Sequence, residues 1–153
     1  MKLDQGAIKK LVRLASVPGQ YPVVCVVDNS GSTGGQREQA QRKVLIAMRR
    51  ATIQHPFEIW CSDTEINQKT YLEANEKMPD SFTITMGGGT DFRPVIHEAD
   101  KLGLKSVIYL TDGDGPVPDE SCLTKIVWGI IRDDKTRTDH LEPFGPVINL
   151  SKI

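Results

Sequence analysis

Residues 23–35 decide the fold, and they read Val-Val-Cys-Val-Val-Asp-Asn-Ser-Gly-Ser-Thr-Gly-Gly. The first five residues are apolar and favour β-structure, which is typical of a strand buried on both faces in the centre of a parallel sheet. Asp28, Ser30 and Ser32 then bring a carboxylate and two hydroxyls at alternate positions, and a helical pattern begins at Gln36. This order predicts that the three side chains lie at the carboxyl end of a central strand, where open α/β sheets place their ligand sites.

The rest of the chain alternates between strand and helix patterns. Apolar runs predict strands at 57–61, 82–85, 105–111, 125–131 and 147–150, and an alternating run at 66–72 predicts an antiparallel edge strand. Apolar spacing predicts helices at 5–15, 36–53 and 92–102, with a short helix at 121–123 and a surface loop at 132–142. The expected fold is α/β and doubly wound: a mostly parallel central sheet, one antiparallel edge strand, and helices on both faces.

Two further loops carry oxygen at predicted strand ends. The first is Gly-Gly-Gly-Thr-Asp at 87–91, and the second is Thr-Asp-Gly-Asp-Gly at 111–115. Carboxylate and hydroxyl oxygens suit Mg²⁺, Mn²⁺ or Ca²⁺ rather than zinc. One carboxylate and two hydroxyls cannot fill an octahedral shell, so these loops are the candidates for further ligands. Three further acidic residues lie at predicted turns: Asp63, Asp91 and Asp114. We interpret them as turn-forming or helix-capping residues before we consider them as metal ligands.

These motifs, taken in order, resemble a known family. Asp28-x-Ser30-x-Ser32, Thr90 in its glycine-rich loop and Thr111-Asp112-Gly113 are similar to the metal-ion-dependent adhesion site (MIDAS) of von Willebrand factor A (VWA) domains. The wording of 87–95, 109–115 and 143–148 is closer still to a bacterial and phage VWA-like domain found C-terminal to predicted metallopeptidases. The resemblance begins at about Tyr21, so we expect an N-terminal helix and linker at 1–20 and a VWA-like domain at 21–153.

The resemblance implies a ligand set and a kind of partner. Ser30, Ser32 and Thr90 would bind Mg²⁺, or Mn²⁺ or Ca²⁺, through hydroxyls, and Asp28 and Asp112 would bind it directly or through water. An Asp or Glu carboxylate of a protein partner would complete the shell, and a MoxR-type AAA+ ATPase is a candidate partner. Peptidase activity does not carry over, because residues 97–101 (His-Glu-Ala-Asp-Lys) lack the second histidine of a His-Glu-x-x-His zinc motif.

Composition narrows the class of protein. A chain of 153 residues is long enough for one self-sufficient core, and its net charge of −1 gives no strong case for nucleic acid or an anionic membrane. No apolar run reaches the length of a membrane span, and no signal-peptide stretch opens the chain. The odd number of cysteines (Cys25, Cys61, Cys122) without a CxxC spacing suits reduced thiols in a cytoplasmic protein.

Two segments allow a functional and a structural interpretation. The helix predicted at 5–15 either packs on the sheet or docks onto another protein, and packing is the usual role of such a stripe. The helix predicted at 36–53 has an apolar face (Ala40, Val44, Met48, Ala51) and five basic residues: Arg37, Arg42, Lys43, Arg49 and Arg50. We interpret these basic residues as a solvated face, with anion binding as the alternative.

Three functions fit the sequence. The leading hypothesis is a non-catalytic, divalent-cation-dependent protein-binding module. The alternative is a metal-dependent hydrolase or phosphoryl-transfer enzyme, with Asp28 as nucleophile or Asp112 and Asp114 activating water. Against it, Ser30 stands where a strand-end phosphotransferase usually has a second carboxylate. The third is an assembly subunit whose ion is only stabilising.

Overall fold

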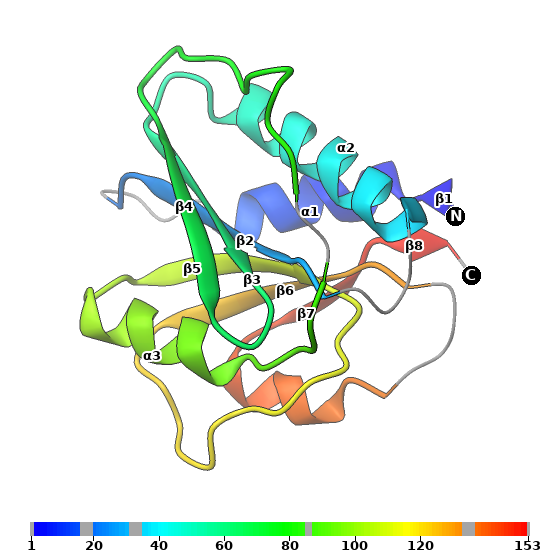
Figure 1. Ribbon diagram of the computed structural model, residues 1–153, viewed down its shortest axis with the longest axis vertical. Helices are drawn as coiled ribbons and strands as arrows, with labels where there is room; N and C mark the ends of the chain where they lie inside the picture. Colours follow the sequence, from blue (N-terminus) through cyan, green and yellow to red (C-terminus); the bar gives the residue numbers. More distant parts are fainter. Residues whose placement is uncertain (1, 16–19, 31–34, 85–86, 133–136, 153) are drawn as a thin grey trace.

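The computed structural model describes residues 2–15, 20–30, 35–84, 87–132 and 137–152. Its centre is a twisted sheet with helices on both sides (Figure 1). The sheet has six strands in the order β4-β3-β2-β5-β6-β7, and only the edge pair β3–β4 is antiparallel. The strands are β2 Val23–Asp28, β3 Phe57–Ser62, β4 Ile66–Leu72, β5 Ser106–Thr111, β6 Lys125–Ile130 and β7 Val147–Asn149. The predicted doubly wound α/β architecture is confirmed.

Strand β2 occupies the middle of the sheet because both of its faces are apolar. All six of its residues are buried. Cys25 and Val27 belong to the core on one side of the sheet, and Val24 and Val26 to the core on the other. Successive side chains of a strand point to opposite faces, so one apolar run supplies two cores.

The helices divide between these two cores. Helices α1 (Gln5–Ala15) and α2 (Gly35–Ala51) pack on the Cys25 side, and α3 (Arg93–Lys101) packs on the Val24 side with the 3₁₀ helix η1 (Asp139–Phe144). Ile8, Leu11 and Ala15 of α1 are buried in the same core as α2, so the packed interpretation of this helix is confirmed. In the described ranges no helix combines the length and apolar character needed to cross a bilayer.

Some local predictions were wrong. Within the described residues 82–84 there is no strand, although Phe82 and Ile84 are buried. The alternation of apolar residues here reflects side-chain burial and not pairing of the backbone with another strand. No helix forms at 121–123, because the Asp100 carboxylate accepts the backbone N–H groups of Leu123 and Thr124 and holds an irregular turn.

The chain ends also differ from prediction. The predicted surface loop at 132–142 contains the start of η1, which buries Leu141 and Phe144. A further pairing, antiparallel between β1 (Lys2–Leu3) and β8 (Ser151–Lys152), was not predicted. Ladders of two residues are too short to show a periodic pattern.

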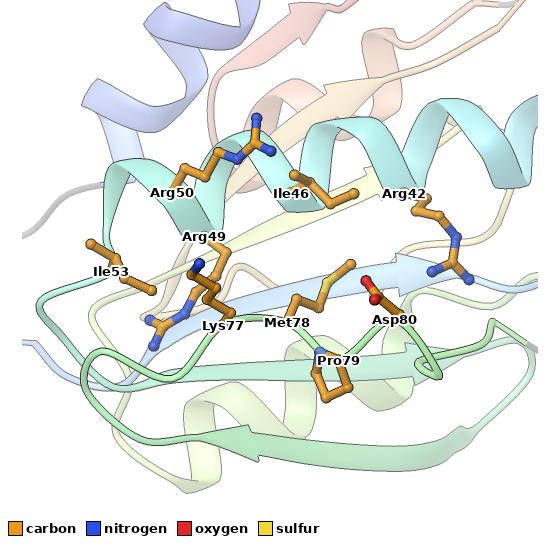
Figure 2. A pocket seen from close by; sticks show the side chains of 9 residues that line it. All are labelled: Arg42, Ile46, Arg49, Arg50, Ile53, Lys77, Met78, Pro79 and Asp80. Carbon is orange, nitrogen blue, oxygen red and sulfur yellow. The ribbon is translucent and has the colours of Figure 1, made fainter.

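The interpretation of the α2 basic residues as a solvated face was wrong for two of the five. Arg37 and Arg49 are buried, with 0% and 2% of their surfaces exposed. The Arg49 guanidinium donates to four backbone carbonyls, those of Thr52, His55, Glu73 and Glu76, and so fastens the end of α2 to the segment after β4. Arg49 lines a groove of about 520 Å³ between α2 and residues 77–80. Figure 2 shows it there with Arg42 and Arg50, which are more exposed.

The described cysteines are free thiols. Cys25 and Cys61 are buried in neighbouring central strands, as predicted, and Cys122 is partly buried. Burial raises the pKa of all three thiols, and that of Cys61 to about 11. The thiolate form, which reacts with electrophiles, is therefore scarce at neutral pH in the folded protein.

Candidate functional site

Three loops meet at the carboxyl edge of the sheet. Asp28 ends β2, and Asp112 follows the last residue of β5, the parallel neighbour of β2. The 87–91 loop is attached to the same edge: Gly87 N–H donates to the Asn29 carbonyl at 2.8 Å, and Asp91 N–H donates to the Asp63 carbonyl at 3.0 Å. The loops that carry Asp28, Thr90 and Asp112 are therefore neighbours.

Asp28 is fully buried, with 0% of its surface exposed. Its Oδ1 accepts the Ser30 backbone N–H at 2.9 Å, and its Oδ2 accepts the Thr111 hydroxyl at 2.6 Å. Both donors are neutral, and among the described residues no cationic side chain lies within ion-pair distance of Asp28. Burying a carboxylate is costly unless a cation or hydrogen-bond donors compensate it, and here the described compensation comes from neutral donors.

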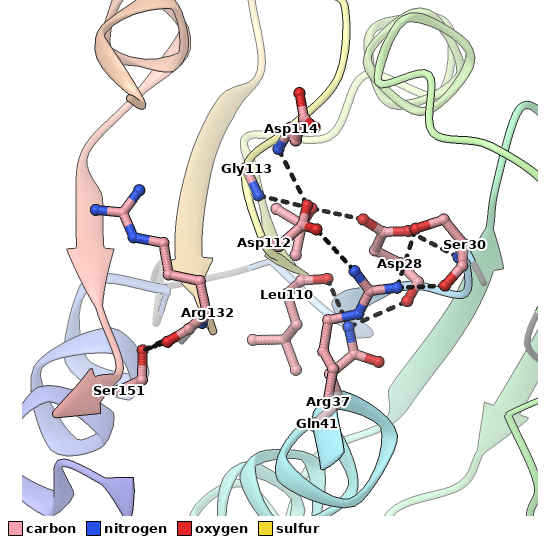
Figure 3. Close-up of polar contacts among 11 residues, drawn as sticks. Asp28, Ser30, Arg37, Gln41, Leu110, Asp112, Gly113, Asp114, Arg132 and Ser151 are labelled. Carbon is pink, nitrogen blue, oxygen red and sulfur yellow. Dashed lines mark hydrogen bonds and ion pairs between the residues drawn. The ribbon is translucent and has the colours of Figure 1, made fainter. Parts of the chain in front are cut away.

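Arg37 places a guanidinium beside this carboxylate but pairs with other groups. It projects from the first turn of α2; its Nη1 donates to Asp112 Oδ2 at 2.9 Å and its Nη2 to Ser30 Oγ at 2.9 Å. Nη2 also donates to the Ser30 carbonyl. Figure 3 shows the guanidinium bridging the Ser30 loop and the Asp112 loop.

Gln41, one turn further along α2, ties the two central strands together. Its side-chain N–H₂ donates to the carbonyl of Asp28 at 3.1 Å and to that of Leu110 at 3.3 Å (Figure 3). Sequence reasoning missed both Arg37 and Gln41. The signal was their spacing: they lie four residues apart and continue toward the loop the buried stripe that includes Val44 and Met48.

Asp112 is a partly buried carboxylate with both oxygens in use. Oδ1 accepts the Asp114 backbone N–H at 3.0 Å, and Oδ2 accepts Arg37. Burial raises the pKa of the Asp112 carboxyl, and the Asp114 N–H and the Arg37 guanidinium oppose that rise. Asp114 shapes this turn through its backbone, while its own side chain is exposed.

The glycine-rich loop places Thr90 near the turn after Asp112. A Cβ built on Gly115 would lie 2.8 Å from Thr90 Cγ2, so the two loops are in contact there. The other acidic candidates have structural partners: Asp91 accepts the Arg93 backbone N–H at 3.0 Å and pairs with its guanidinium at 2.8 Å, and Asp63 accepts the Glu65 N–H at 3.2 Å. Ser32 lies outside the described residues.

The donor chemistry of the site fits a hard divalent ion. Asp28, Ser30 and Asp112 offer carboxylate and hydroxyl oxygens, as Mg²⁺ prefers. The described part of the chain holds no cluster of three or more His, Cys, Asp and Glu side chains that could bind a metal. Two of the oxygens concerned, Ser30 Oγ and Asp112 Oδ2, are bonded to Arg37.

Comparison with known families agrees with this architecture. Residues 23–151 match the family described as VWA-like domain (DUF2201), and the comparison with curated proteins gave no match. The matched residues contain all six strands of the main sheet, helices α2 and α3, and the three loops at the carboxyl edge. The chain therefore belongs to the VWA-like domain family.

Proposed function

We propose that this protein is a non-catalytic, divalent-cation-dependent binding module that recognises a protein partner at the carboxyl edge of its sheet. The observation that carries the proposal is the Asp28 carboxylate, which is fully buried and whose hydrogen-bond donors within the described residues, Ser30 N–H and Thr111 Oγ1, are both neutral. Such a group is expensive to keep unless a positive charge joins it when the protein acts.

The residues that would hold the ion come from the three loops. Asp28 and Asp112 supply negative charge, and the hydroxyls of Ser30, Ser32 and Thr90 supply neutral oxygen. Mg²⁺ is the first candidate, with Mn²⁺ or Ca²⁺ as alternatives, because all the donors are hard oxygens. The bound ion would supply a positive charge that attracts an Asp or Glu carboxylate of the partner.

The geometry favours binding over catalysis. An attacking carboxylate needs an oxygen that can reach a substrate, whereas Asp28 is fully buried and each of its oxygens accepts a hydrogen bond. Asp112, the other candidate for acid–base work, has one oxygen on the Asp114 N–H and one on Arg37. Both oxygens of each carboxylate accept hydrogen bonds, so we assign no catalytic residue.

We propose the partner's binding group from the chemistry of the site. It presents a carboxylate to the edge formed by the 28–30, 87–91 and 111–115 segments. The family resemblance makes a MoxR-type AAA+ ATPase of the cytoplasm the first protein to test.

Isothermal titration with Mg²⁺ and with Mn²⁺ tests the ion. Asp28→Asn keeps the size of the side chain and removes its charge, so it should abolish ion binding while circular dichroism shows an intact fold. Asp114→Asn, which removes the same charge from an exposed side chain in the neighbouring turn, is the matched control and should bind normally. Equal Mg²⁺ affinity in the wild type and in Asp28→Asn would refute the proposal.

A second experiment separates a binding module from an enzyme. The protein is assayed with phosphatase and peptidase substrates in Mg²⁺ and in Mn²⁺, and it should turn over none of them. Partner capture from the native lysate is then run with Mg²⁺ and with EDTA. Turnover that disappears in Asp28→Asn would replace the proposal with the hydrolase alternative.

A further inference from the structure

Arg37 occupies the space between two groups that are expected to bind the ion. Its guanidinium lies 2.9 Å from Ser30 Oγ and 2.9 Å from Asp112 Oδ2, and the whole residue is buried. These oxygens come from different loops, and in the described structure the guanidinium is the group that bridges them (Figure 3). A positive charge already sits where the ion is expected.

The environment of Arg37 differs from that of a purely structural arginine. The first turn of a helix disfavours a cation, because the helix dipole is positive at that end, so the Asp112 carboxylate must compensate Arg37. Its Nε is buried and finds no hydrogen-bond partner among the residues that the structure describes. Arg49 of the same helix, in contrast, uses Nε and both terminal nitrogens on backbone carbonyls.

We infer that Arg37 is a tethered internal cation that closes the ion site, and that a divalent ion and the Arg37 guanidinium compete for Ser30 Oγ and Asp112. The inference rests on the proposed function. Asp28, Asp112 and Arg37 together carry one net negative charge, which favours an added cation. An ion placed beside the guanidinium would be strongly repelled at this low dielectric, so Arg37 must leave as the ion enters.

The consequence is a site whose ion affinity is held down by the protein itself. The ion must replace the hydrogen bonds that Arg37 makes with Asp112 Oδ2 and Ser30 Oγ. The displaced guanidinium must then bind another group or water. The helix does not have to move, because Gln41 anchors α2 to the Asp28 and Leu110 carbonyls independently of Arg37. The competition is therefore confined to one side chain.

Calorimetric Mg²⁺ titration of three proteins tests the inference: the wild type, Arg37→Gln and Arg42→Gln. Arg37→Gln should raise Mg²⁺ affinity by about tenfold or more, which corresponds to about 1.4 kcal/mol. Arg42→Gln is the matched control: it removes the same charge from the same helix, but Arg42 lines the groove between α2 and residues 77–80. Its affinity should stay within about twofold of the wild type, because Arg42 is partly exposed and solvent and salt screen its charge.

The outcomes separate this inference from the proposed function. Equal Mg²⁺ affinity in the wild type and Arg37→Gln would overturn the inference and leave the ion-dependent module standing. Absence of binding in all three proteins would overturn both. Binding in Arg37→Gln with weak binding in the wild type is the expected result.

A measurement on the wild type keeps the inference falsifiable if Arg37→Gln fails to fold. The Nε–H resonance of Arg37, assigned by nuclear magnetic resonance, should shift during a Mg²⁺ titration, and the shift should grow in proportion to the fraction of protein that has bound the ion. The Arg49 Nε–H, which is bonded to the Glu76 carbonyl, should not shift. Saturation of the protein with Mg²⁺ while the Arg37 signal stays in place would overturn the inference.

Discussion

Arg49→Met should destabilise the protein strongly, and Arg50→Met should not. The two residues are adjacent in the last turn of α2, yet Arg49 is buried and Arg50 is exposed. The Arg49 guanidinium lies 2.6 Å from the carbonyls of both His55 and Glu73, 2.8 Å from that of Glu76 and 3.3 Å from that of Thr52 (Figure 2 shows the side chain). Methionine keeps the apolar stem and a similar helix propensity, so the comparison isolates the guanidinium.

The magnitude follows from the four carbonyls that lose their donor. A hydrogen bond to a charged group contributes roughly 1.5–3 kcal/mol, which would give about 6 kcal/mol or more if every carbonyl stayed dry. Glu73 and Glu76 are exposed, so water can reach their carbonyls and recover about half of that loss. Removing a buried charge recovers some more, because burial disfavours the charged form and lowers the pKa of Arg49, an effect that the charge of Glu76 partly offsets. We expect a net loss of about 3 kcal/mol.

Urea denaturation followed by circular dichroism measures the difference. Arg49→Met should lower the free energy of unfolding by about 3 kcal/mol, or the melting temperature by about 6–12 °C for a chain of this size. Arg50→Met should stay within about 0.5 kcal/mol of the wild type, as surface substitutions usually do. If the two variants differ by less than about 1 kcal/mol, the four-carbonyl anchor does not stabilise the fold as argued.

Two further predictions concern the core. A Cβ at Gly145 would overlap the Ile126 carbonyl of β6, whereas one at Gly103 would meet nothing within 4 Å, although both glycines have positive φ. Gly145→Ala should therefore cost about 3 kcal/mol or more and Gly103→Ala about 1 kcal/mol in the same urea assay, and equal costs would contradict the packing. Because burial raises the pKa of Cys61 to about 11 and that of Cys25 further, iodoacetamide at pH 8 should alkylate the more accessible Cys122 first. Mass spectrometry should find Cys25 and Cys61 modified only after denaturation or at strongly alkaline pH, and rapid native labelling of either would show that its strand opens.

The sequence predicts the sheet well because a strand that is buried on both faces must consist almost entirely of apolar residues. The run at 23–27 could be placed in the centre on this ground, the run at 105–111 was predicted as a strand, and the alternation at 66–72 marked the antiparallel edge. It also predicts that Asp28 and Asp112 share an edge, since parallel strands end on the same side of a sheet. It does not predict the partners of these carboxylates, which depend on side chains that reach across from other elements.

Arg37 shows why the site could be predicted only in part. A basic residue on a helix is usually solvated, and composition alone gave no reason to treat Arg37 differently from Arg42. Its position on the stripe that faces the sheet would carry it over the carboxyl edge, where a charge is buried unless it is paired. The pairing with Asp112 depends on how β5 ends relative to α2, and this is a property of the assembled fold.

The two buried arginines of α2 differ in the groups that accept their hydrogen bonds. Arg49 binds neutral carbonyls at turns, and no competing cation is expected there because those groups carry no net charge. Arg37 binds a carboxylate and a hydroxyl, which are also good ligands for a hard ion, so its partners have an alternative. We therefore propose that the same residue type, buried in the same helix, stabilises the fold at one end and regulates the access of an ion to oxygen ligands at the other. If Arg37→Gln were to lower the free energy of unfolding as much as Arg49→Met while leaving Mg²⁺ affinity unchanged, this distinction would be wrong and both arginines would be structural.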